Sequence, residues 1–201
     1  MATMNAAEVT VGSAAATGAI FVAPTTVSLP SDATTSLSSD WSLLGFTSDA
    51  GVQISETSSN TAIHAWEGRV EVYNVRTEYR ENVSFTPIQC NADVAKLIWG
   101  EDAVTVDAAG TMLAKHHGKN LEPVHIVIET TPREGIVKRF CQKSQLTERG
   151  EVTMNGTQVD GRQLTFNNLA DENGVTCYEY TAFTEEESEP EGETGAEGET
   201  A

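Results

Sequence analysis

The clearest pattern along the chain is an alternation of apolar and polar residues between positions 73 and 85. One set comprises Tyr73, Val75, Thr77, Tyr79, Val83 and Phe85, and the other comprises Asn74, Arg76, Glu78, Arg80, Asn82 and Ser84. Successive side chains of a strand point to opposite faces, so a period of two predicts a long strand with one packed and one solvated face. Pro87 is expected to end this strand.

The residues before this strand, 40–68, show little periodicity. They are rich in Ser, Thr and Asp, and apolar side chains such as Trp41 and Trp66 interrupt them. Loops of this length in a compact domain tend to be functional, so we expect a long functional loop here. The alternative is a surface loop with two incidental tryptophans, which is less expected because interfaces favour this residue.

One helix is expected, over residues 91–100. Asn91 is a good N-cap, Gly100 suits the position past the end, and Val94, Leu97 and Ile98 form an apolar stripe. Strands are expected at 18–23, 103–106, 112–115, 123–130, 136–146, 151–154, 158–159, 162–169 and 175–183. Helices do not alternate with these strands, which excludes a parallel sheet. The predicted fold is therefore mainly β: an antiparallel β-sandwich or half-barrel with one short flanking α-helix.

Composition divides the chain into a domain and two appendages. Residues 1–17 are mostly Ala, Thr and Gly and are expected to form a mobile N-terminal arm of the 1–183 domain. Residues 184–201 hold eight Glu and no basic residue, and we expect a disordered acidic tail. The formal net charge of −18 opposes binding to phosphate, so a sequence-reading nucleic-acid protein is excluded.

No residue pattern in the chain predicts catalysis, a cofactor or a metal site. Nucleotide-binding and hydrolase motifs are absent, and the adjacent His116 and His117 would point to opposite faces of a strand. Cys90, Cys141 and Cys177 lie far apart in apolar contexts and are expected to be buried free thiols. Residues 14–23 are too short and interrupted for a membrane span, so no membrane partner is expected. An enzyme is the weakest interpretation.

Four loosely spaced features lie along residues 15–183: Leu29-Pro30, Trp41 with Gly45, Asp49-Ala50-Gly51 and Ala65-Trp66-Glu67-Gly68. Together they resemble the major tail tube subunit of long, non-contractile-tailed bacteriophages. The resemblance implies a virion structural protein, assembled in the host cytoplasm into hexameric rings that stack around a tape-measure protein. It also implies tail-tip and terminator proteins as partners, and loop 40–68 as an assembly arm. The oligomerisation contacts would then be Trp41, Leu44, Phe46, Ile54 and Trp66.

Such a tube would conduct DNA into the host without binding it specifically. A basic lining would be adhesive, because each neutralised phosphate releases counterions, so the lumen should be net negative. The polar face of the long strand supplies the lumen candidates, which are Asn74, Glu78, Asn82 and Ser84. On the same face, Arg76 and Arg80 are expected to pair with acids such as Glu78.

Two other functions remain open. One is a monomeric β-sandwich module of the virion that serves in binding, decoration or adhesion, and the other is the inner tube of a contractile tail or secretion system. Ring formation would separate the first from a tail tube, and a neighbouring sheath gene would identify the second.

Overall fold

The computed structural model describes residues 10–15, 18–133, 135–157 and 159–183, and all structural statements below concern these residues. The predicted acidic tail, 184–201, lies outside them, as does most of the predicted N-terminal arm. Within that arm, the carbonyl of Ser13 accepts a hydrogen bond from the backbone N–H of Thr131 at 2.8 Å. The proposed domain boundaries stay a prediction.

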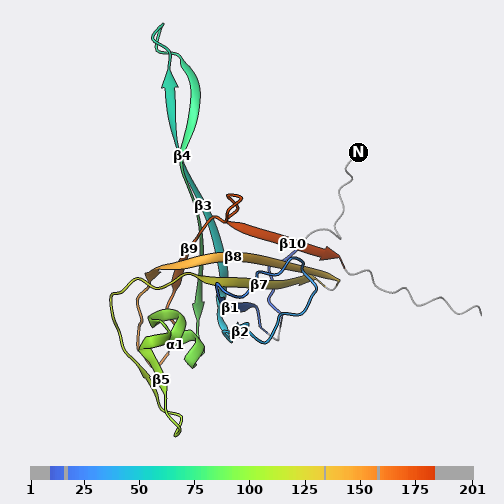
Figure 1. Cartoon of the computed structure of the whole chain (residues 1–201), viewed down its shortest axis with the longest axis vertical. Helices are drawn as coiled ribbons and strands as arrows, with labels where there is room; N and C mark the ends of the chain where they lie inside the picture. Colours follow the sequence, from blue (N-terminus) through green and yellow to red (C-terminus); the bar gives the residue numbers. More distant parts are fainter. Residues whose placement is uncertain (1–9, 16–17, 134, 158, 184–201) are drawn as a thin grey trace, which may run out of the picture.

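The described chain is built mainly from β-strands (Figure 1). In order, the elements are β1 (Ile20–Pro24), β2 (Ser42–Leu43), β3 (Thr47–His64), β4 (Glu71–Pro87), α1 (Ala92–Trp99), the 3₁₀ turn η2 (Glu101–Ala103), β5 (Val104–Val106), β6 (Met112–Ala114), β7 (Val124–Arg133), β8 (Ile136–Arg149), β9 (Leu164–Asn168) and β10 (Cys177–Phe183). The mainly antiparallel β fold with one α-helix, predicted from the sequence, is confirmed.

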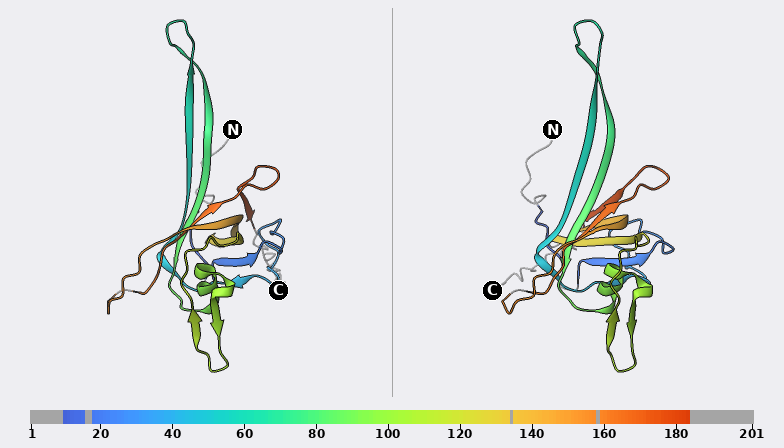
Figure 2. Two further views of the ribbon diagram at one scale, coloured as in Figure 1. Left: turned by 60° about the vertical axis from the view of Figure 1, so that its left-hand side comes forward. Right: turned by 90° about the vertical axis from the view of Figure 1, so that its left-hand side faces the viewer.

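The large sheet is antiparallel and has the order β2-β1-β7-β8-β9-β4-β3, with β10 also paired to β8. Strand β8 is long enough to pair with β10 along its first part and with β9 along its last part. Strands β5 and β6 form a separate small hairpin that projects from the body at the end opposite to β3 and β4 (Figure 2).

The sheet curls around the larger of two buried clusters. Val83 and Phe85 of β4 share one buried cluster with Ile20 and Val22 of β1, although β7, β8 and β9 lie between these strands in the sheet. Helix α1 fills the concave side, because its apolar stripe packs into the same cluster. The result is the half-barrel form of the predicted architecture, and its burial of apolar surface is the main stabilising term.

The other face of the sheet is covered by residues 25–41. Trp41 packs there with Val127 and Cys141 and is only 9% exposed. The segment is fastened to the sheet by Arg139, which is 3% exposed and donates from Nη1 to the backbone carbonyl of Asp32 at 2.8 Å. This extended connection is thus a fixed layer of the fold.

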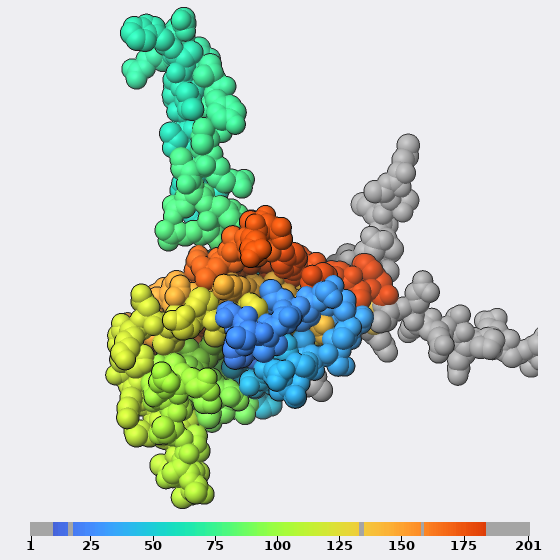
Figure 3. Space-filling view, viewed as in Figure 1, coloured from blue at the N-terminus to red at the C-terminus, as the bar shows by residue number. Residues whose placement is uncertain are grey.

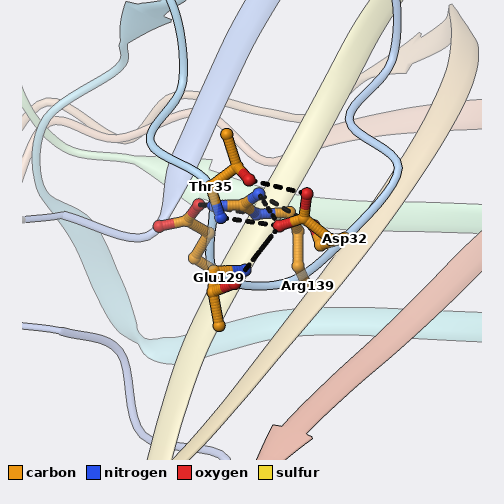
Figure 4. Close-up of polar contacts among 5 residues, drawn as sticks. Asp32, Thr35, Glu129 and Arg139 are labelled. Carbon is orange, nitrogen blue, oxygen red and sulfur yellow. Dashed lines mark hydrogen bonds and ion pairs between the residues drawn. The ribbon is translucent and has the colours of Figure 1, made fainter.

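The Asp32 carboxylate organises its own turn in this layer (Figure 4). It accepts hydrogen bonds from the backbone N–H groups of Thr34 and Thr35 at 2.8 and 2.6 Å, and from the Thr35 hydroxyl at 2.7 Å. These bonds, led by those from Thr35, lower the pKa of Asp32 to about 2. Arg139, which binds the backbone carbonyl of Asp32, also forms an ion pair with Glu129.

The helix prediction is confirmed at both ends. The Asn91 side chain accepts from the backbone N–H of Val94 at 2.7 Å, and Gly100 has φ 94°, which suits glycine past the helix end. The predicted strand 151–154 is wrong, because residues 151–157 and 159–163 belong to an irregular connection between β8 and β9. Of the predicted strand 158–159, position 158 lies outside the described residues, and Val159 is not in a strand. The turn residues there had suggested hairpins.

The prediction of a loop over 40–68 is wrong for most of its length. Residues 47–64 form β3, which pairs with β4 from Thr47↔Pro87 to His64↔Glu71, with shifts of register along the way. The pairing turns this segment and the predicted long strand into one β-hairpin. Both faces of β3 are largely exposed, so no hydrophobic period marks it in the sequence.

Candidate assembly arm

The outer part of the β3–β4 hairpin stands away from the body as an arm (Figures 1 and 2). Strand β4 pairs with β9 only through residues 82–85, whereas residues 71–81 pair with β3 alone. At about 3.3 Å per residue, the arm extends on the order of 33 Å beyond the sheet. The space-filling view shows no other described part of the chain covering it (Figure 3).

Large apolar side chains of the arm are exposed along its length. Tyr73 pairs with Ile63 near the tip, and Val83 pairs with Ile54 near the root. The register shift between Ser59 and Asn60 lies between these pairs, so the odd-numbered residues of β4 do not keep to one face along the whole arm. The large apolar side chains are 37–65% exposed and comprise Ile54, Ile63, Tyr73, Val75 and Tyr79. Exposed apolar side chains on a projecting hairpin are typical of an interaction site.

The charged residues of the arm are partly neutralised within the chain. The Nε atom of Arg80 lies 2.6 Å from Oε1 of Glu78, as the sequence had predicted for this pair. Arg76 instead lies over the ring of Tyr79, with 5.7 Å from its guanidinium carbon to the ring centroid. A cation over an aromatic face is attracted by the ring quadrupole. The β3 partners of these two residues, Asn60 and Ser58, lie two positions apart on one side of that strand, so Arg76 and Tyr79 share a side of the arm.

The root of the arm is held by Glu81, a residue that the alternation of the sequence had left out. Glu81 falls between Tyr79 and Val83 on the apolar side, is buried, and accepts a hydrogen bond from the Thr176 hydroxyl. Thr176 directly precedes β10, so this bond links the root of the arm to the start of β10. An acid that interrupts an apolar period is the sequence signal for such a buried polar contact.

The predicted oligomerisation residues divide into two groups. Leu44 is 1% exposed and, like Trp41, lies in the core of the chain. Phe46 (72% exposed) and Ile54 lie at the arm root, and Trp66 (95% exposed) lies at the tip. The assembly role of these five residues stays a prediction.

The predicted lumen residues also lie in two places. Asn74 and Glu78 are on the free arm, whereas Asn82 and Ser84 lie where β4 joins the sheet. There the register pairs Asn82 with Asn167 and Ser84 with Thr165 on β9, and pairs the same two residues with β3. The face is polar and uncharged across these three strands, and its residues are Gln53, Ser55, Asn82, Ser84, Thr165 and Asn167.

The remaining candidate chemistry is structural. His116 stacks on Trp99 with ring centroids 3.7 Å apart, and no group of three or more potential metal ligands occurs in the described part of the chain. Cys90 is exposed, which corrects the prediction that all three thiols are buried. Burial raises the pKa of both Cys141 and Cys177 to about 12. Among the described residues, no helix is long and apolar enough to cross a membrane.

The fold and the arm define an antiparallel β protein whose most distinctive surface is an exposed apolar hairpin. The sequence matches the phage tail tube protein family over residues 2–189, and the chain therefore belongs to that family. None of the curated proteins compared with the chain matches it. The protein is a structural component of the phage virion tail, in a family that is generally non-enzymatic, and the resemblance to tail tube subunits is confirmed.

Proposed function

We propose that the protein assembles through the β3–β4 arm into rings that stack as the tail tube and conduct DNA during ejection. The observation that carries the proposal is the set of exposed large apolar side chains on the arm, which extends beyond the body (Figure 1). In a chain that acted alone, this surface would favour aggregation. Contact with a second copy would remove it from water.

The shape of the chain favours a head-to-tail assembly, in which the arm of one copy contacts the body of the next. The arm is a projection and the rest of the chain is a compact body, so an arm that packs on a neighbouring body forms a heterologous contact. Such contacts close into rings or continue as filaments, depending on the rotation between copies. The free outer edge of β3, at the end of the described sheet, offers backbone groups for the same contact. Six copies to a ring is what the resemblance implies.

The lumen is proposed to be lined by the polar, uncharged face around Asn82 and Ser84. Neutral side chains offer phosphate no counterion release, so DNA can slide past many stacked rings. Arg80, two residues before Asn82 on β4, is compensated by its pair with Glu78. Asn74 and Glu78, on the arm, are placed at the contact between copies in this proposal.

Assembly in the host cytoplasm around a tape-measure protein, and capping by tail-tip and terminator proteins, belong to the same proposal. These partners are inferred from membership of the family. The choice between a non-contractile tail and the inner tube of a contractile tail rests on whether a sheath gene lies beside this one.

Electron microscopy of the purified protein tests the proposal, with and without the tape-measure protein. Rings or tubes are expected, and mass measurement over a range of concentrations should show species far larger than the monomer. A protein that stays monomeric under all these conditions would favour the alternative, a decoration or adhesion module.

A further inference from the structure

A groove lies at the root of the arm, between residues 10–15, β2, the start of β3, the end of β7 and the start of β8. Its volume is about 740 Å³, and apolar side chains dominate its lining. Phe46 and Leu43 in this lining are 72% and 38% exposed, although both are large hydrophobic residues. Val52, Ile54 and Phe140 line the same groove. The described part of the chain leaves this apolar hollow open.

The opposite end of the same hairpin carries the most exposed large hydrophobic side chain of the described chain, Trp66. Its turn is fixed by the backbone: the N–H of Ala65 donates to the carbonyl of Val70 at 2.8 Å, and Gly68 and Arg69 have φ of 69° and 52°. A positive φ is unusual for a residue other than glycine, so the tip has a defined conformation. Trp66 is therefore presented on a pre-formed turn.

We propose that Trp66 of one copy inserts into the groove at the arm root of a second copy. The inference rests on the proposed function and specifies its contact. An exposed aromatic side chain and an apolar pocket are the pairing that typically dominates binding energy at an interface. The groove is large enough for an indole ring and leaves room for the flanking residues of the tip.

Charge is compatible with the same pairing. Lys138 is the only charged residue among those that line the groove in the described chain, and its Nζ lies 3.5 Å from Oε1 of Glu179. Glu67 directly follows Trp66 at the tip, so in the proposed contact its carboxylate would compete with Glu179 for Lys138. Complementary charge of this kind fixes the orientation of a contact more than its strength.

The arrangement also sets a repeat distance. From Ile54 at the groove to Trp66 at the tip, the hairpin spans on the order of 40 Å at about 3.3 Å per residue. Each copy would fill the groove of the next with its tip and offer its own groove to the previous one. The arm length would thus determine an axial repeat of up to about 40 Å.

The decisive experiment is a disulfide cross-link between two different copies, made in a Cys90→Ser background. One preparation carries Trp66→Cys and the other carries Phe46→Cys, so that a 66–46 disulfide can form only between chains. Mixing under assembly conditions and mild oxidation should give a cross-linked dimer. The matched control pairs Trp66→Cys with Leu113→Cys, which places the second thiol on the exposed but distant β6, and should give none.

A second measurement uses the critical concentration for assembly. Trp66→Ala should raise it at least tenfold, the loss expected of a buried interface aromatic, while Met154→Ala at another exposed apolar site should leave it unchanged. Thermal unfolding of both variants verifies that the monomer remains folded.

The outcomes separate the inference from the proposed function. Two results together would overturn the inference and leave the tube intact. Trp66→Ala would form tubes at the wild-type critical concentration, and the mixture of Trp66→Cys with Phe46→Cys would give no 66–46 cross-link. A cross-link between two position-46 thiols would also overturn it, because it would mean that grooves face each other. A wild-type protein that never polymerises would refute both.

Discussion

Glu129 of β7 and Arg139 of β8 are register partners, and the Nε of Arg139 donates a hydrogen bond to Oε1 of Glu129 at 2.8 Å. The guanidinium side chain is 4% exposed and the carboxylate side chain 22%. Arg139 also holds Asp32, so this one cation connects two strands and the covering segment 25–41. Glu129 is its nearest carboxylate, because Oδ1 of Asp32 lies farther away, at 3.9 Å from Nη1.

Glu129→Gln should therefore lower the free energy of unfolding by about 3 kcal/mol, because it leaves a buried cation without its nearest carboxylate. The matched control is Glu78→Gln, which breaks the Arg80–Glu78 pair, whose side chains are 66% and 48% exposed. An exposed pair of this kind contributes less than about 1 kcal/mol. Urea unfolding of the monomeric protein measures both, and equal losses would contradict the role given to Arg139.

Trp41 and Trp66 should separate folding from assembly. Trp41→Ala removes a large side chain from the cluster with Val127 and Cys141, and should lower the free energy of unfolding by about 3 to 5 kcal/mol. Trp66→Ala removes a side chain that is already in water and should change it by less than about 0.5 kcal/mol. Chemical denaturation gives both values. A large loss for Trp66→Ala would mean that the tip packs on its own chain.

The three thiols should react in two classes. Cys90 is exposed, whereas burial raises the pKa of Cys141 and Cys177 to about 12 and keeps them protonated near pH 8. The thiolate is the reactive form, so a thiol reagent at pH 8 should label one cysteine quickly in the native protein and three in urea. Cys90→Ser should abolish the fast reaction. Fast labelling that survives this substitution would show that Cys177 is accessible.

Stability should fall in mild acid through His125. Burial, followed by the nearby Lys143, lowers the pKa of this histidine below its ordinary value of 6.5, although its Nδ1–H donates to the Val27 carbonyl at 2.8 Å. The unfolded chain then binds more protons, so the contribution of His125 is complete above pH 6.5 and is lost as the pH falls toward its folded pKa. Asp32, with a pKa of about 2 against 3.8, acts only at lower pH.

Urea midpoints at pH 7.5 and 5.5 test this dependence. The wild-type midpoint should be lower at pH 5.5, and His125→Gln should reduce the difference between the two values. His64→Gln removes an exposed histidine and serves as the control. An unchanged pH dependence in His125→Gln would assign the acid sensitivity to other groups.

The fold could be predicted where burial leaves a period in the sequence. Residues 83 and 85 of β4 alternate because one face packs on the core, and Asn91 and Gly100 mark helix ends by their capping chemistry. Strand β3 could not be recognised, because residues 52–61 carry Ser, Thr, Asn and Glu on two exposed faces. Backbone hydrogen bonds to β4 hold β3 in its extended conformation, and such bonds leave no hydrophobic pattern in the sequence.

The two tryptophans show the same limit at the candidate site. Sequence alone could indicate that Trp41 and Trp66 matter, since this residue is rare in polar segments. It could not decide which one is buried, because that depends on the fold of segment 25–41 over Cys141 and on the extension of the hairpin. Burial in the chain assigns Trp41 to stability and leaves Trp66 for contacts with other molecules.

The last prediction concerns the channel. Asn82 and Ser84 are partly exposed on the uncharged part of β4 that pairs with β9, so lysine at these positions can extend into water without disturbing the core. If this face lines the tube, each ring of an Asn82→Lys, Ser84→Lys phage would attract DNA phosphate, and the attraction would add up along the tail. Ejection should slow markedly at low salt and recover as salt rises. Release of DNA from purified particles, followed with a fluorescent dye, measures the rate, and Asn82→Asp, Ser84→Asp is the control that should eject normally. Wild-type ejection by the lysine variant at low salt would place this face away from the DNA.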